Sequence, residues 1–562
     1  MQRLGAGLCV VLLSLSLLSA CARSDAPHSS GAGSDMMQSG VLGNYLAGRF
    51  ALSEGDASTA SQDLLKAAAE RPNDPELAEQ ALIATLLTGQ PEAVELASRL
   101  PDNQFSGLVL ANVDVKSGQW SSAEQNFRKL PRHGMTQLLQ PLLVAWAQLG
   151  DGRPDAALST LHPYFEGPGF RSIFLANAAI IADLGNRPEE SAQLYHALET
   201  GMTEPNLRLS QAVASWESRS GHSVDAQRTL ASLANAEIDM SIAMPALLAK
   251  VNQRVVATLS DGIAETYFMF AAALHTQDMN PFSLIILRMA LGLRPNYPAA
   301  CLLMADILTA QQHPAMALAV LTDVPASDPI YPVVELRRAA LLETLGRSTE
   351  AMRSLQRLSD HYPFSPLPDA QRGDILGSNK RHPEAIQAYN KAISRIVTPS
   401  PTNWILFYAR GVAEDQAKQW PKAEGDLQRA LDLAPNQPFV LNYLGYSWAN
   451  SGHHLDKARQ MIEAAALARP NDGAIIDSLG WIQFRQGDVA AAVKTLERAV
   501  ELEPEEPTIN GHLGDAYWAA NRKLEADYQW RRALILNPAP ADAAKLEAKL
   551  NAEPTGRFLS GQ

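Results

Sequence analysis

Aromatic, amide and carboxylate side chains recur at related positions in the C-terminal third of the chain, at intervals of about 35 residues. Aromatic rings anchor many protein interfaces, and Asn or Asp side chains can hold the backbone of an extended peptide. The combination therefore predicts a protein-binding groove. Its candidate residues are Tyr408, Asn442, Tyr446, Asp477, Trp481, Phe484, Asp515 and Trp518.

The same rings also have a purely structural explanation. In this alternative, Trp481 and Phe484 only pack against the neighbouring helix and bind no partner. The set also lacks the Lys and Arg side chains that clamp a free C-terminal carboxylate in some chaperone-binding proteins. A peptide C-terminus is therefore not the expected ligand of this groove.

No motif of a familiar catalytic or cofactor site is present in the sequence. There is no HExxH, no phosphate-binding GxxxxGK[ST], no GxSxG and no paired CxxC. His453 and His454 with Asp456 resemble a metal site, but a solvated turn explains them better. We therefore expect no catalytic residue, no metal, no cofactor and no small-molecule substrate. An enzyme with an unrecognised site is the least favoured alternative.

Residues 1–20 have the pattern of a signal peptide. Arg3 precedes an apolar run from Leu8 to Leu18 that is too short to span a bilayer. The run ends at Leu18-Ser19-Ala20-Cys21, which resembles the bacterial lipoprotein box. That resemblance implies a lipid on the Cys21 thiol and cleavage before it. The alternative is an ordinary secretory signal that happens to contain a cysteine.

The residues after Cys21 indicate where such a lipoprotein would reside. Ala22 stands where an Asp typically retains lipoproteins in the inner membrane, so the resemblance implies the periplasmic face of the outer membrane. Two or three acyl chains would anchor the protein stably. Residues 21–40 are rich in Ser, Gly and Asp, which predicts a flexible tether.

Composition and charge narrow the classes of partner. The chain has 562 residues, a net charge of −13 and 46% hydrophobic residues, so it is long enough for a repeat array and is not a disordered chain. Nucleic-acid binding needs a basic surface, so the acidic balance argues against a nucleic-acid partner. The single downstream cysteine, Cys301, is expected to be a small buried helix residue.

Three columns of residues keep one period through the C-terminal third. Glycines are spaced by 34, 35 and 34 residues, and alanines and prolines by 35, 34 and 34. The extra residue is expected in the loop Gly452–Leu455. The glycine column should let a second helix approach closely, the alanine column should be the matching small residue, and each proline should end the second helix. The columns are Gly411, Gly445, Gly480 and Gly514; Ala423, Ala458, Ala492 and Ala526; and Pro435, Pro470, Pro504 and Pro538.

This pattern resembles the tetratricopeptide repeat, and the resemblance covers nearly the whole chain after residue 40. It implies an all-α fold, a solenoid in which antiparallel helix pairs stack into a right-handed superhelix. The first helix of each pair would line the concave surface. A single pair cannot bury its own apolar face, so neighbouring pairs must stack.

The quality of the repeat match suggests the organisation of the chain. We expect degenerate repeats over residues 41–262, with an insert at 236–262 that fits no repeat well. Central repeats follow over 263–397 and regular repeats over 402–540. Residues 541–562 should form a capping helix and tail, because the last repeat needs its open end covered.

The C-terminal signatures are more particular than a generic repeat. Residues 441–446, 476–481 and 512–515, together with the lipoprotein box, resemble a family of outer-membrane tetratricopeptide lipoproteins of Gram-negative bacteria. That family includes an adaptor that delivers substrates to a periplasmic carboxyl-terminal processing protease. The resemblance implies protein partners, a lipid anchor and a non-enzymatic adaptor or scaffold. The alternative is an assembly factor for exported polysaccharide or outer-membrane machinery.

Overall fold

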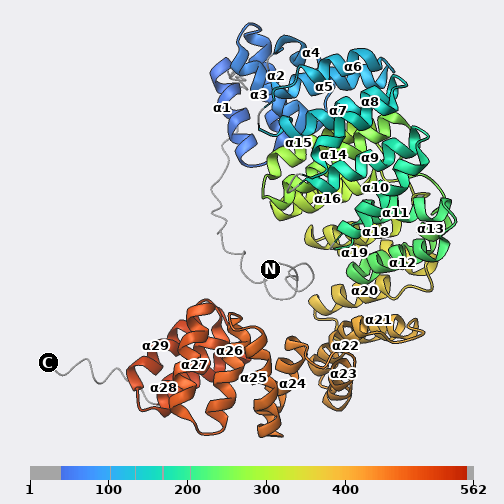
Figure 1. Cartoon of the computed structure of the whole chain (residues 1–562). Coiled ribbons are helices and arrows are strands. Elements are labelled where there is room, and N and C mark those ends of the chain that lie inside the picture. Colours follow the sequence, from blue (N-terminus) through green and yellow to red (C-terminus); the bar gives the residue numbers. More distant parts are fainter. Residues whose placement is uncertain (1–39, 102, 133, 167–169, 203, 553–562) are drawn as a thin grey trace. The chain divides into compact units, whose positions relative to one another are not determined.

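The computed structural model describes residues 40–101, 103–132, 134–166, 170–202 and 204–552. Every regular element within these ranges is a helix, which confirms the predicted all-α solenoid of helix pairs (Figure 1). The signal peptide, Cys21 and residues 21–39 of the predicted tether lie outside the described residues. The chain divides into two compact units, Met1–Pro368 and Asp369–Gln562, and this division lies inside the block 263–397.

The N-terminal unit consists of helix pairs with short connections. Two 3₁₀ helices, η2 (His162–Tyr164) and η3 (Ile238–Ile242), interrupt it. Its α-helices are α1 (Val41–Ser53), α2 (Ala57–Glu70), α3 (Pro75–Thr88), α4 (Glu92–Arg99), α5 (Gln104–Lys116), α6 (Trp120–Arg128), α7 (Thr136–Gly150), α8 (Pro154–Leu161), α9 (Arg171–Leu184), α10 (Pro188–Gly201), α11 (Leu207–Arg219), α12 (Ser223–Ala236), α13 (Met244–Ala249), α14 (Leu259–Thr276), α15 (Asn280–Leu293), α16 (Pro298–Ala310), α17 (Pro314–Val320), α18 (Tyr331–Thr344) and α19 (Ser348–His361).

The C-terminal unit begins within α20 (Leu367–Ser378), and a 3₁₀ helix, η4 (Pro401–Asn403), precedes α22. Its other helices are α21 (His382–Ser394), α22 (Trp404–Gln416), α23 (Trp420–Leu433), α24 (Pro438–Ser451), α25 (Leu455–Ala468), α26 (Gly473–Arg485), α27 (Val489–Leu502), α28 (Pro507–Ala519), α29 (Lys523–Ile535) and α30 (Pro540–Ala552).

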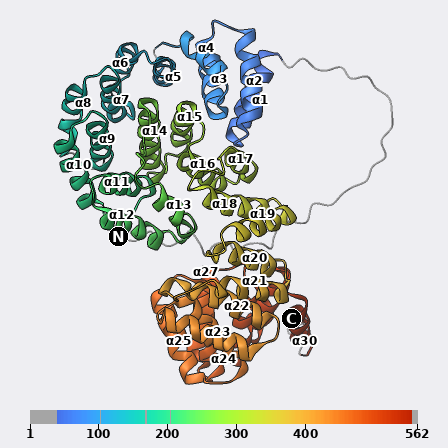
Figure 2. The same ribbon diagram turned by 90° about the vertical axis from the view of Figure 1, so that its right-hand side faces the viewer.

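The helix pair α14–α15 packs inside the arc of the N-terminal repeats (Figure 2). Helix α14 contacts α7 and α9, and α15 contacts α3 and α5. Buried side chains join these layers: the Tyr267 hydroxyl donates to Asn112 Oδ1 at 2.9 Å, and the Thr266 hydroxyl donates to Asn177 Oδ1 at 2.5 Å. The inner face of these repeats is therefore covered by the chain itself, a feature that the repeat pattern does not predict.

The glycine and alanine columns of the C-terminal unit act as predicted. A Cβ atom on Gly480 would lie 2.6 Å from Leu496 Cγ, and one on Gly514 would lie 2.4 Å from the Trp530 ring. The alanines of the column, Ala492 among them, are fully buried. Helices α23, α25 and α27 each end two residues before the proline of the third column, and α29 ends three residues before it. These facts confirm the register of the repeat.

The extra residue between Gly445 and Ala458 lies in the loop Gly452–Leu455, as predicted. The left-handed residue of the turn stands seven residues after the glycine column in all four repeats; these residues are Lys418, Gly452, Gly487 and Asn521. The second helix begins two residues after it at α23, α27 and α29, but three residues after it at α25. The added residue therefore follows Gly452, and His454 there is itself left-handed with φ 49°.

Helix α30 spans the predicted capping helix and packs on α29. Its Leu546 is buried in the same apolar cluster as Trp530.

In the N-terminal unit, Cys301 is buried within α16, as predicted. Burial raises the pKa of its thiol to about 11, which disfavours the reactive thiolate. Among the described helices, none has the length and apolar character needed to cross a membrane.

Candidate protein-binding surface

Three first helices of the C-terminal repeats, α24, α26 and α28, bring part of the predicted set together. The Trp481 ring stacks on His512 with 4.0 Å between ring centroids and on Phe484 with 5.2 Å. The Tyr446 ring also lies near His512, with 6.3 Å between the two ring centroids. We call Tyr446, Asp477, Trp481, Phe484 and His512 the aromatic cluster.

The Asp477 carboxylate fixes the orientation of His512. Asp477 is buried on α26, and its two oxygens lie 3.0 and 2.9 Å from His512 Nδ1. The imidazole is thereby held flat against Trp481. His512 is not among the predicted groove residues, because it occupies the sixth position of its repeat rather than an expected groove position. A carboxylate and an imidazole 35 residues apart, one repeat length plus one, are the signal that would have identified it.

Four buried polar atoms on these helices lack a hydrogen-bond partner among the described residues. Two of them belong to predicted groove residues, Asn442 Oδ1 on α24 and Trp481 Nε1 on α26, and the other two are Gln483 Oε1 and Asn510 Oδ1. Asn442 lies one helical turn before Tyr446 on α24. Burial raises the pKa of the Tyr446 hydroxyl to about 12, so the hydroxyl keeps its proton and stays a hydrogen-bond donor at neutral pH. Buried polar atoms are almost always paired in folded proteins. An unpaired acceptor and an unpaired donor therefore offer hydrogen bonds to a partner.

Tyr408 belongs to a different contact set from the aromatic cluster. Its ring packs edge-on against Tyr443 and beside Trp404, with 6.0 and 5.9 Å between ring centroids, within the apolar layer between α22 and α24.

The structural explanation applies in part to Trp481 as well, because the Trp481 ring packs on His512 of the neighbouring first helix. Its unpaired Nε1 is the feature that packing leaves unexplained.

The last two predicted residues lie against the capping end of the unit. Asp515 accepts from Trp530 Nε1 at 2.9 Å and from Lys549 Nζ of α30 at 2.6 and 2.7 Å. Trp518 packs on Trp530 at 5.3 Å, and the Lys523 ammonium lies 3.2 Å from its ring centroid. These contacts join the last repeat to its cap, and we assign Asp515 and Trp518 to that junction rather than to the aromatic cluster.

The histidines in the loop between α24 and α25 are the candidate metal ligands named from the sequence. His454 takes a left-handed conformation with φ 49° before α25, and its ring lies 5.0 Å from Trp448. No group of three or more His, Cys, Asp or Glu side chains arranged to hold a metal ion occurs in the part of the chain that the structure describes. The aromatic cluster offers stacking surface and hydrogen bonds, which are the means of recognising a polypeptide.

Residues 334–365, 371–438, 451–507 and 478–543 match family models of the tetratricopeptide repeat. A TPR repeat-containing protein of Pseudomonas aeruginosa is 29% identical over 182 residues, which are 32% of this chain and 30% of that protein. The bacteriophage adsorption protein A of Escherichia coli is 33% identical over 95 residues, 17% of this chain and 9% of that protein. The chain thus spans less than a third of the length of these relatives.

A mouse protein O-mannosyl-transferase is 27% identical over 126 residues, which are 22% of this chain and 13% of that enzyme. Among solved structures, a chain of the APC/C hetero-tetramer Cut9-Hcn1 is 16% identical with a TM-score of 0.39, covering 90% of this chain and 95% of that one. YrrB, described as a TPR protein with an unusual peptide-binding site, is 20% identical with a TM-score of 0.26. The match covers 31% of this chain and 87% of that one.

The matches to family models of the tetratricopeptide repeat support a protein-interaction scaffold.

Proposed function

We propose that this repeat protein is a non-enzymatic adaptor that binds an extended segment of a partner protein on the surface formed by α24, α26 and α28. The observation that carries the proposal is the pair of unpartnered buried atoms, Asn442 Oδ1 and Trp481 Nε1, beside stacked aromatic rings. A peptide backbone supplies one donor and one acceptor per residue, which is the complement of these two atoms. The aromatic cluster supplies apolar surface for its side chains.

The double variant Asn442→Ala/Trp481→Ala should lose capture of the native partner. Truncating one aromatic anchor typically costs about 2 kcal/mol, or roughly thirtyfold in affinity, and the lost hydrogen bond adds to that. The measurement is site-specific photo-crosslinking in envelope fractions, followed by titration of the identified partner against the purified full chain. Circular dichroism establishes whether the variant keeps its helical fold.

The matched control is Lys494→Ala on the second helix α27, where the side chain is exposed. This variant should bind the partner as the unmodified chain does. If the folded double variant and the control bind equally well, the surface assignment is wrong.

The proposal includes a lipid anchor at Cys21, motivated by the sequence Leu18-Ser19-Ala20-Cys21 at the end of a short apolar run. Cys21→Ser should remain unprocessed or appear in the soluble periplasmic fraction, because no thiol remains to carry the acyl chains. Cell fractionation with metabolic labelling by a palmitate analogue tests this. Normal processing and membrane retention of Cys21→Ser would exclude the anchor.

The finer proposal is that the adaptor presents bound substrates to a periplasmic carboxyl-terminal processing protease. Its support is the resemblance of residues 441–446, 476–481 and 512–515 to the outer-membrane lipoprotein family that contains such an adaptor. Crosslinked partners decide between this role and the alternative. Recovery of the protease with a peptidoglycan hydrolase supports the adaptor, whereas recovery of polysaccharide-export or outer-membrane assembly components supports an assembly factor.

A further inference from the structure

A cavity of about 200 Å³ lies within the N-terminal unit, where α11, α12, the start of α16 and the segment before α18 meet residues 247–255. Those residues belong to the segment 236–262 that matches no repeat. They form the end of α13 and the loop that leads to α14. The irregular segment therefore builds one wall of the cavity, and exposed Lys250 on that wall makes the cavity reachable from solvent.

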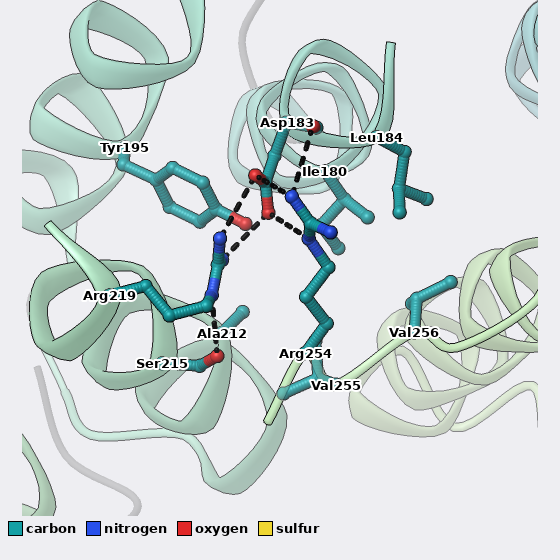
Figure 3. A pocket seen from close by; sticks show the side chains of 10 residues that line it. All are labelled: Ile180, Asp183, Leu184, Tyr195, Ala212, Ser215, Arg219, Arg254, Val255 and Val256. Atoms are coloured by element: carbon teal, nitrogen blue, oxygen red, sulfur yellow. Dashed lines mark hydrogen bonds and ion pairs between the residues drawn. The ribbon is translucent and has the colours of Figure 1, made fainter. Parts of the chain in front are cut away.

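The loop wall is fixed by polar contacts to the repeats around it. Figure 3 shows the guanidinium groups of Arg219 and Arg254 on the two sides of the Asp183 carboxylate, with distances of 2.7–3.0 Å to Arg219 and 3.0–3.2 Å to Arg254. Burial raises the pKa of Asp183, but these hydrogen bonds outweigh burial and hold it below its usual value. The Ser215 hydroxyl also donates to the Gln253 carbonyl at 2.8 Å. The cavity is thus preformed.

Two cations lining the cavity keep donors that the protein does not use fully. The Lys250 ammonium donates to the Ser327 carbonyl at 2.8 Å and forms no ion pair within the described residues. Arg294 donates weakly to the Val255 carbonyl at 3.4 Å, and its nearest carboxylate, Asp261, is 4.0 Å away. Arg208 and Arg254 also line the cavity, but Glu265 neutralises Arg208, and Arg254 shares the Asp183 carboxylate with Arg219. Lys250 and Arg294 are therefore the lining cations that have no carboxylate at hydrogen-bond distance among the described residues.

A buried tyrosine forms part of the cavity wall. Tyr297 is 1% exposed and lines the cavity, and its hydroxyl interacts with the buried Arg208–Glu265 pair. The Arg294 guanidinium lies 4.6 Å from the centre of its ring, which holds that cation at the cavity wall. Leu247, Pro298 and Ile330 add apolar lining. Cationic and apolar groups thus converge on one space.

We propose that this cavity binds the carboxylate of a small apolar residue, either as a free acylated amino acid or as the C-terminal residue of a polypeptide. A cavity of about 150 Å³ can hold benzene, so the space fits one leucine-sized residue. Asp328 is the one carboxylate among the lining residues and offsets part of the charge, which favours a monoanion over a phosphate dianion. The site lies in the N-terminal unit and does not depend on the aromatic cluster of α24, α26 and α28.

Calorimetric titration of the full chain with N-acetyl-leucine tests the proposal. We expect saturable binding below about 10 mM, and no binding of N-acetyl-leucinamide, which lacks the charge. Lys250→Gln and Arg294→Gln should each weaken the binding about tenfold, because each removes a charge-assisted hydrogen bond. Lys250 is exposed, so its substitution should not impair folding.

The matched control is Lys129→Gln, an exposed lysine of the same unit outside the cavity, which should bind N-acetyl-leucine as the unmodified chain does. The tripeptide Gly-Gly-Leu distinguishes the two possible ligands. Tighter binding than that of N-acetyl-leucine indicates the C-terminal residue of a polypeptide, and weaker binding indicates a free acylated amino acid. Absence of saturable binding, equal binding of the amide, or equal or tighter binding of inorganic phosphate would overturn the proposal.

Discussion

Ala492→Glu should disrupt the C-terminal unit and lower its free energy of unfolding by about 3 kcal/mol or more. Ala492 is 0% exposed in α27 and shares an apolar cluster with Leu496 and Ala526. The helices here are close enough that a Cβ atom on Gly480 would already lie 2.6 Å from Leu496. A glutamate would bring a charge to a site with neither space nor a partner.

The damage should begin at α26 and α27 and spread to the adjoining pairs, since repeat stability is built from neighbour interfaces. Thermal unfolding by circular dichroism and limited proteolysis measure it. Ala490→Glu is the matched control: residue 490 is exposed in the first turn of the same helix, where an acidic side chain is favourable. Identical melting curves and cleavage patterns for the two variants would show that the assigned register is wrong.

The register could be predicted from the sequence because its causes are local and repeated. Gly480 and Gly514 each face a bulky side chain of the following helix, Leu496 or Trp530, so the same small residue is required once per repeat. A requirement that recurs every 34 or 35 residues is visible in the sequence itself. The extra residue lies in the loop Gly452–Leu455, where the sequence places it, because a turn tolerates an added residue more readily than a packed helix does.

The position of α14 and α15 inside the N-terminal arc could not be predicted from the repeat pattern. The contacts that hold them, such as Tyr267 with Asn112, join residues 155 positions apart, and no periodic signal links such residues. One indication was available in composition. Residues 263–274 are apolar almost all round the helix, apart from Glu265, and such a helix must be covered on every side.

The candidate surface was predicted in part. Rings on successive first helices converge when they occupy the same repeat position, which is why Tyr446 and Trp481 both meet His512. Asp515 and Trp518 occupy equivalent positions in the α28–α29 repeat. Their side chains contact Trp530 and, at Asp515, Lys549 of α30 instead. The junction with α30 therefore breaks the equivalence on which the prediction rested.

Glu265→Leu should destabilise the N-terminal unit by about 3–5 kcal/mol, because it leaves the Arg208 guanidinium buried without a counter-charge. Glu265 is 1% exposed on α14, and its oxygens accept from Arg208 Nε at 2.9 and 3.2 Å. Burial lowers the pKa of Arg208, but Glu265 outweighs burial and raises it, so the arginine stays charged. Hydrogen exchange of α11 and α14 should accelerate by more than about a hundredfold.

Two further variants distinguish the buried pair from ordinary surface electrostatics. Arg208→Leu/Glu265→Leu should recover most of the lost stability, since an apolar pair of similar volume often replaces a buried ion pair at little cost. Glu350→Gln, which removes an exposed pair with Arg347 in the same unit, should leave exchange unchanged. If the single Glu265→Leu variant exchanges as slowly as Glu350→Gln, then the Arg208–Glu265 pair does not hold α14 inside the arc, and apolar packing alone must do so.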